Sequence, residues 1–187
     1  MANGQLYTQA MVSTLRIVEQ VPRGQWHVPT PCTEWDAEQV ANHIIGENLW
    51  AGELFLGKTV AEVGARLDGD LTGDDPAAAY RRSVEVARKA VEARGAMKVT
   101  CHLSFGDYSG ADYAGQLFMD TLIHDWDIAK GTGQETRIDA QLVSACLPIA
   151  EVLTRQFREA AVFGQNLPVS EDADQQTKLL ALLGRRP

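Results

Sequence analysis

Residues 34–57 read EWDAEQVANHIIGENLWAGELFLG, and this stretch sets the helical character of the chain. Asp36 is a preferred N-cap residue, and Gln39 stands three positions later, where it completes a capping box. A helix is therefore expected to begin directly after Asp36, with Trp35 and Val40 forming the hydrophobic staple around the cap. At helical spacing, the apolar face of this helix runs through Val40, Ile44 and Leu54.

Apolar spacing and end signals predict further helices on both sides of this stretch. The first helix carries Leu6 to Val18 and stops at Pro22, and the third runs from its cap Asp75 to about Gly95. The fourth begins at the capping box of Ser109 and Asp112 and ends near Gly131 or Gly133. A fifth runs from about Asp139 to Arg158 with a kink or early break at Pro148, and a short amphipathic helix follows in the tail 169–187. The β-branched and aromatic residues of 97–110 predict a short extended piece or hairpin before the fourth helix.

The composition limits the possible functions. The chain has 187 residues, a formal net charge of -8 and 45% hydrophobic residues, which is enough for one well-buried core. This acidic balance offers no basic surface for nucleic acid and disfavours anionic membranes, so neither is expected as a partner. The sequence contains no membrane-spanning stretch or secretion signal, and a cytoplasmic location is expected. The cysteines Cys32, Cys101 and Cys146 have no CxxC spacing and are expected to be reduced, mostly as small buried hydrophobes.

The expected architecture is an all-α bundle of helices around one core. The segment from Lys58 to Asp74 is rich in Gly and Asp and is long enough to return along the bundle, which lets the second and third helices run parallel. Residues 1–165 are expected to form the helical domain, and residues 166–187 a tail whose short helix packs on it.

Two helices carry ionisable residues among large apolar ones. On the fourth helix one stripe contains Asp120 and His124, and on the second helix the corresponding stripe contains His43 and Glu47. If both stripes face the core, these groups meet inside the bundle, where bare charges are costly. A divalent cation shared by two imidazoles and a carboxylate offsets that cost. The spacing alone also allows the simpler interpretation of two intrahelical contacts, Glu47 with His43 and Asp120 with His124, and no metal.

Three segments resemble a known family. HVPTPCTEWDAEQVANHIIGENLWAGELFLG (27–57) resembles the first metal-ligand segment of the mycothiol-dependent maleylpyruvate isomerase metal-binding family, a branch of the DinB/YfiT-like superfamily. DTLIHDWDIAKGTGQ (120–134) is similar to its second ligand segment, and FGQNLPVSEDADQQTKLLALLGRRP (163–187) resembles the tails of short actinobacterial members. The resemblance implies a four-helix bundle of up-down-down-up order. It also implies His43, Asp120 and His124 as ligands of zinc, or alternatively nickel.

The sequence departs from the isomerase in two respects. Asp120 stands where the isomerase is expected to carry Glu, so this ligand is one methylene shorter. The isomerase also has a further C-terminal domain in place of the short tail. Because of these two differences, the isomerase activity itself is not inferred for this chain.

Three protein ligands leave a coordination position open, as in catalytic zinc sites. The resemblance then favours a metal-activated thiolate, with mycothiol as the cosubstrate and a small electrophile as the partner in transfer or isomerisation. Alternatives are a hydrolase that uses metal-bound water and a non-catalytic metal-binding stress or sensor module. A cavity with basic or polar groups near Lys58 and Lys98 would favour the enzyme, and a sealed apolar cavity the module. A homodimer is also possible.

Supporting roles are assigned by position along the helices. Glu47 is the candidate general base or a partner that orients His43, and Asp127 is a candidate partner of His124. The tryptophans Trp35, Trp50 and Trp126 are expected in the core rather than at a substrate. His27 and His102 are not expected to bind metal, and Cys32 lies in a loop from which a thiol can approach the site.

Overall fold

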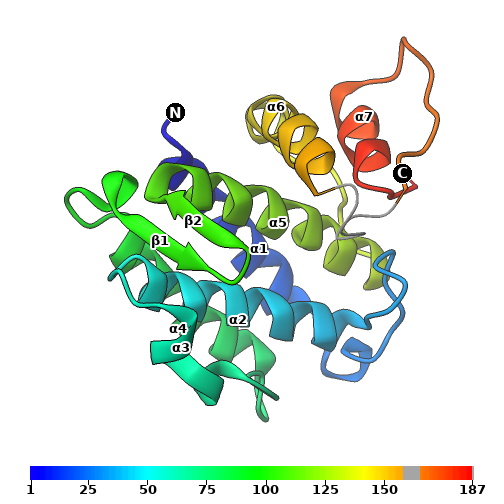
Figure 1. Ribbon diagram of the computed structural model, residues 1–187. Coiled ribbons are helices and arrows are strands. Elements are labelled where there is room, and N and C mark those ends of the chain that lie inside the picture. The colour runs from blue at the N-terminus through cyan, green and yellow to red at the C-terminus, as the bar shows by residue number, and fades with distance from the viewer. Residues whose placement is uncertain (158–164, 187) are drawn as a thin grey trace.

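The computed structural model describes residues 1–157 and 165–186, and this part of the chain is mostly helical with one small antiparallel sheet (Figure 1). The α-helices are α1 (Asn3–Gln20), α2 (Ala37–Leu54), α3 (Val60–Val63), α4 (Pro76–Val91), α5 (Gly110–Gly131), α6 (Ala140–Gln156) and α7 (Gln175–Leu182). The strands are β1 (Thr100–Leu103) and β2 (Gly106–Ser109), and short 3-10 turns occupy Arg23–Gln25, Gly64–Leu67 and Ala96–Lys98. No helix within the described residues combines the length and apolar character needed to cross a membrane.

The predicted caps are confirmed. The Gln39 amide donates to Asp36 Oδ1 at 2.9 Å, and the Asp36 amide donates to Gln39 Oε1 at 3.0 Å, which is the reciprocal capping box that begins α2. The Ser109 hydroxyl accepts from the Asp112 amide at 3.1 Å at the start of α5. These side chains satisfy amides that a helix start leaves without a partner, and they fix where α2 and α5 begin.

Some predicted bounds need correction. The region 58–74, predicted as loop, contains α3 and a 3-10 turn. The helix predicted to reach Gly95 ends at Val91, and the chain then turns through Gly95, whose φ of 86° is left-handed. α6 continues through Pro148 to Gln156, so the early break does not occur, and its predicted end at Arg158 lies outside the described residues.

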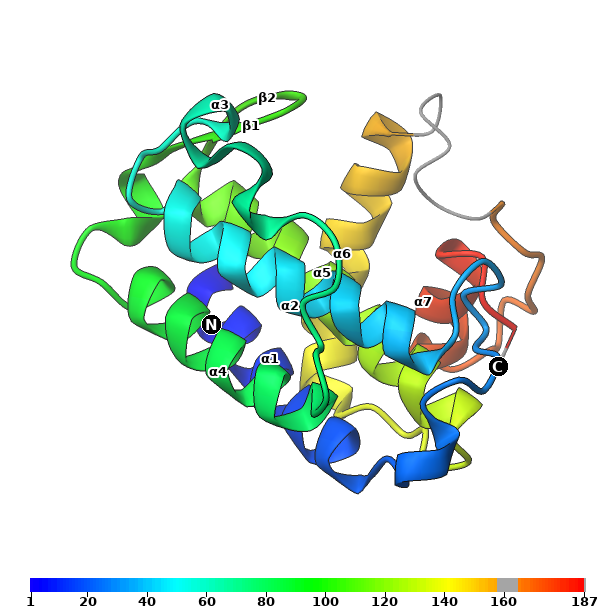
Figure 2. The same cartoon turned by 90° about the horizontal axis from the view of Figure 1, so that it is seen from below.

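The core lies between four helices that contact one another in pairs. α1 contacts α4 and α5, and α2 also contacts α4 and α5. Figure 2 shows these four helices grouped on one side of the molecule. The predicted apolar face of α2 is confirmed because its members are at most 3% exposed, namely Val40, Ile44 and Leu54. This packing places the stripe of α2 that contains His43 and Glu47 opposite the stripe of α5 that contains Asp120 and His124.

The β1–β2 hairpin borders α2 and α5, and the end of α6 reaches it, because Gln156 Nε2 donates to the Tyr108 hydroxyl at 2.8 Å. β1 and β2 pair antiparallel, with Thr100 opposite Ser109 and Leu103 opposite Gly106, which confirms the predicted hairpin directly before α5. α6 contacts α5 and α7, and α7 packs against α6 through a short row of buried leucines. The described residues that follow α7 lie beside the loop that leads into α2 (Figure 2).

Candidate metal centre

His43, Asp120 and His124 come together at the interface of α2 and α5. His43 Nε2 lies 3.0 Å from Asp120 Oδ2, and His124 Nε2 lies 3.6 Å from Asp120 Oδ1. Each residue offers one ligand atom, and the three atoms lie within 4.8 Å of one another. His43 thus pairs across the helix interface with Asp120, which departs from the simpler interpretation in which its contact is with Glu47 on its own helix.

The spacing of these atoms suits a small transition-metal ion. Ligand atoms bonded to zinc at about 2.0 to 2.2 Å in a tetrahedron lie roughly 3.3 Å apart. Asp120 approaches the two imidazoles through different oxygens, with Oδ2 at 3.0 Å from His43 and Oδ1 at 3.6 Å from His124, and both separations are of that order. The side chains of His43 and Asp120 are 26% and 28% exposed, whereas that of His124 is 7% exposed, so the centre is reached from the side of His43 and Asp120.

Trp35 covers the two imidazoles. Its ring centroid lies 4.8 Å from that of His43 and 5.7 Å from that of His124, and the imidazoles are 5.0 Å apart and edge-on to each other. The prediction of Trp35 as an ordinary core residue is therefore incomplete, because it also holds the histidine rings in place. Trp126 is 2% exposed, as predicted for a core residue, whereas Trp50 lines a cavity.

The close charges shift the pKa values of the centre. Burial favours the neutral form of Asp120, but the two adjacent imidazoles outweigh it and lower the pKa of Asp120 to about 2. Burial by itself lowers the pKa of His43, yet the charge and hydrogen bond of Asp120 raise this pKa to about 9. His43 and Asp120 thus form an ion pair at neutral pH, and a metal ion has to displace a proton from His43.

Glu47 lies one turn after His43 and faces the same cavity as Asp120. Burial is the main reason that the pKa of Glu47 is raised to about 7, and the negative charge of Asp120 adds to it. A carboxyl group with this pKa exchanges a proton near neutral pH, as a general base must. The structure places Glu47 where the sequence-based role requires it, and that role stays a prediction.

A buried ion pair between Asp127 and Arg185 lies on the Nδ1 side of His124. Asp127 Oδ2 lies 3.0 Å from His124 Nδ1, and Asp127 accepts hydrogen bonds from the guanidinium of Arg185 at 2.8 and 3.3 Å. The Asp127 side chain is fully buried and that of Arg185 is 11% exposed. These bonds outweigh the burial that disfavours the carboxylate and hold the pKa of Asp127 below its ordinary value. With its Nδ1 directed at Asp127, His124 presents Nε2 to the centre.

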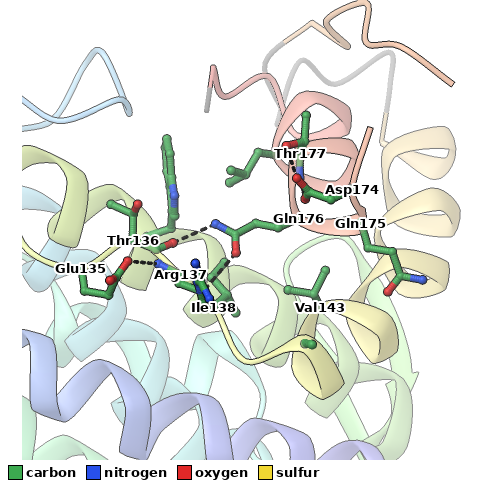
Figure 3. A pocket seen from close by; sticks show the side chains of 12 residues that line it. Glu135, Thr136, Arg137, Ile138, Val143, Asp174, Gln175, Gln176 and Thr177 are labelled. Atoms are coloured by element: carbon green, nitrogen blue, oxygen red, sulfur yellow. Dashed lines mark hydrogen bonds between the residues drawn. The ribbon is translucent and has the colours of Figure 1, made fainter. Parts of the chain in front are cut away.

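Arg185 is held in place by the anchored tail. Figure 3 shows Gln176 of α7 pointing at the segment before α6, where its amide donates to the Thr136 carbonyl at 2.8 Å and accepts from the Ile138 amide at 2.9 Å. These bonds lie on the wall of a cavity of about 640 Å³ that none of the three candidate ligands lines. The Arg185 amide also donates to the Leu180 carbonyl at 2.8 Å, which fixes the turn after α7.

A second cavity, of about 630 Å³, adjoins the candidate metal centre. His43, Glu47 and Asp120 line one side of it, and its other walls come from α2, α3, α5, α6 and the β1–β2 hairpin. It reaches the surface beside Phe105, which is 54% exposed. Among its described lining residues there is neither a lysine nor an arginine, so the basic groups that would favour the enzyme do not line it, although the polar residues Ser104 and Gln116 do.

The remaining candidate residues lie elsewhere or play other parts. His27 pairs with Asp36 and Glu38, and His102 pairs with Asp107 on the hairpin, both away from the three ligands. Cys101 and Cys146 are fully buried, as predicted. Cys32 lies within reach of His124 and Asp127, with which it forms a second group of potential ligands, and burial raises the pKa of its thiol.

Comparisons with known proteins identify a family for this chain. The family model of the mycothiol maleylpyruvate isomerase N-terminal domain matches residues 7–129, which include His43, Asp120 and His124. Two uncharacterised proteins of Mycobacterium tuberculosis, from strains CDC 1551 / Oshkosh and H37Rv, are each 33% identical over 159 residues, which cover 84% of this chain and 83% of theirs. No solved structure matches the chain. By its sequence from α1 to α5, this chain belongs to the mycothiol maleylpyruvate isomerase N-terminal domain family.

Proposed function

We propose that this protein is a cytoplasmic, metal-dependent enzyme that uses a low-molecular-weight thiol, with mycothiol as cosubstrate, to transfer or isomerise a small electrophile. The observation that carries the proposal is the convergence of His43, Asp120 and His124, whose ligand atoms lie within 4.8 Å of one another beside an open cavity. Family membership supports mycothiol as the thiol. We also propose that α1, α2, α4 and α5 form the up-down-down-up bundle of the DinB-like superfamily.

Each residue of the centre has a definite part in this proposal. His43, Asp120 and His124 would hold zinc, or alternatively nickel, and the bound cation would keep a thiol as thiolate near neutral pH. Asp127 fixes His124 so that Nε2 faces the centre. Glu47, with its pKa raised to about 7 mainly by burial, accepts the proton of the incoming thiol at a carboxylate oxygen in the cavity.

A non-catalytic metal-binding module is the second candidate. It is favoured by the lining of the cavity, in which the described residues offer no lysine or arginine for a polar sugar conjugate. Calorimetric titration with mycothiol separates the two functions. We expect binding heat with the metal-loaded chain and none after chelation. Absence of heat with the loaded chain would favour the module.

The ligand assignment is tested by metal analysis. Protein purified without added metal is expected to contain close to one zinc or nickel ion per chain, and His43→Ala and His124→Ala are expected to lose it. His102→Ala is the matched control because this imidazole pairs with Asp107 on the hairpin. Metal retained at the wild-type level in both ligand variants would refute the assignment.

A further inference from the structure

The cavity beside the candidate centre is mostly apolar. Its walls away from the three ionisable residues include the hydrophobic side chains of Trp50, Leu54, Leu103, Leu117, Leu153 and Phe157. A volume of about 630 Å³ lies within the usual range for small-molecule sites and exceeds what a short aliphatic acid fills. Binding in this space is driven by removing apolar surface of the ligand from water.

The charges of the cavity wall disfavour an anionic ligand. Glu47 and Asp120 are its carboxylates, and His43, its one basic group among the described lining residues, is already paired with Asp120 at 3.0 Å. If the proposed function holds, a divalent cation, Asp120 and one thiolate together carry no net charge. A substrate carboxylate would then lose its hydration without gaining a cationic partner.

One polar atom of the wall has no hydrogen-bond partner among the residues that the structure describes. Gln116 Nε2 is buried and makes no hydrogen bond within the described part of the chain, although Gln116 lines the cavity. A buried donor of this kind costs free energy unless a ligand accepts from it. It lies on α5 one turn before Asp120, so an acceptor that meets it is held next to the centre.

We propose, building on the function above, that the electrophile of this site is an uncharged, largely apolar molecule with a carbonyl-type acceptor that meets Gln116. Maleylpyruvate carries two carboxylates and does not match this description. The substrate class therefore differs from the one in the name of the family.

Methyl cinnamate and cinnamate form a matched pair of probes for this cavity, because they share a shape and differ in charge. Calorimetry or ligand-observed NMR would measure their binding to the full-length chain, both metal-loaded and stripped with a chelator. We expect the ester to bind at least about tenfold more tightly than the acid to the stripped chain, and to the metal-loaded chain once mycothiol is bound. Cinnamate that binds the stripped chain as tightly as the ester would overturn the proposal.

Variants at the rim and the wall sharpen the test. Val60 lines the cavity and is 36% exposed, so Val60→Lys supplies the missing cation, and it is expected to raise cinnamate affinity several-fold. Val86→Lys is the matched control, since Val86 is 42% exposed and does not line the cavity. Gln116→Met is expected to weaken the ester about three- to tenfold, in line with the loss of one neutral hydrogen bond.

These outcomes are separate from those of the proposed function. If the ester is preferred but no metal is held, the substrate class stands and the metal-dependent function fails. If metal and mycothiol bind but the acid is preferred, the function stands and the substrate class is wrong. No change in ester affinity in Gln116→Met would show that the amide does not meet the ligand.

Discussion

Replacing Arg185 by methionine tests whether the C-terminal tail supports the centre. The guanidinium makes two hydrogen bonds to Asp127, at 2.8 and 3.3 Å, and Asp127 is fully buried. Arg185→Met removes the positive charge and leaves this carboxylate with His124 as its remaining partner. Breaking a buried pair in this way costs about 3 to 5 kcal/mol of the free energy of unfolding. For a chain of this size that corresponds to a fall in Tm of about 6 to 20 °C.

Urea unfolding followed by circular dichroism measures this loss, and Arg186→Met is the matched control because Arg186 is exposed. We expect the control to change stability by less than about 0.5 kcal/mol. In the double variant Arg185→Met, Asp127→Asn the carboxylate charge is also gone, so the loss should be smaller than the sum of the two single losses by about 2 kcal/mol. A loss in Arg185→Met no larger than in Arg186→Met, or full additivity, would refute the reasoning.

Three further predictions concern neighbouring groups. Asp127→Asn is expected to weaken metal affinity about 10- to 100-fold, measured by competition with a chelator of known affinity, because a neutral amide replaces the carboxylate that orients His124. Metal affinity is expected to rise about tenfold per pH unit between pH 6 and 8, because the metal displaces a proton from His43. The ion pair with Asp120 raises the pKa of His43 to about 9. An affinity that does not depend on pH would contradict this prediction. Burial raises the pKa of Asp125 to about 7 from 3.8, against the hydrogen bond from Ser13. The folded chain therefore retains a proton that the unfolded chain releases, so stability falls as pH rises from about 4 to 7. Asp125→Asn should be more stable than wild type by about 3 to 4 kcal/mol at pH 8 and nearly equal at pH 4, which urea unfolding at both pH values checks.

The sequence predicts the features that depend on near neighbours in the chain. The cap at Asp36 involves residues three positions apart, and the structure confirms it. His43, Asp120 and His124 could be chosen because helical spacing puts each on a stripe with apolar residues, and those stripes face the core. That the two stripes also face each other follows from the contact between α2 and α5, which the resemblance indicated and the spacing alone did not.

Features that depend on distant contacts were missed. Arg185 lies 58 residues after Asp127, in a tail with no local signal that relates it to α5. The sequence pattern predicts Trp35 as a hydrophobic-staple residue. In the structure its ring also lies against the imidazoles of His43 and His124, because the segment that leads into α2 passes next to them. The helix α3 has only four residues, too few to show an apolar period within a loop rich in glycine and aspartate.

If the proposed function holds, the paired charges of the centre allow a thiol to enter in its protonated form. Without a divalent cation, protonated His43 balances Asp120, and Arg185 balances Asp127. When a divalent cation replaces the proton of His43, the cation and Asp120 together leave one excess positive charge, which ionised Glu47 can cancel. A thiol that passes its proton to Glu47 exchanges one negative charge for another, so the buried centre keeps its neutrality throughout the transfer. In the metal-free centre the pKa of Glu47 is raised to about 7, chiefly by burial, so this carboxyl group can exchange a proton near neutral pH.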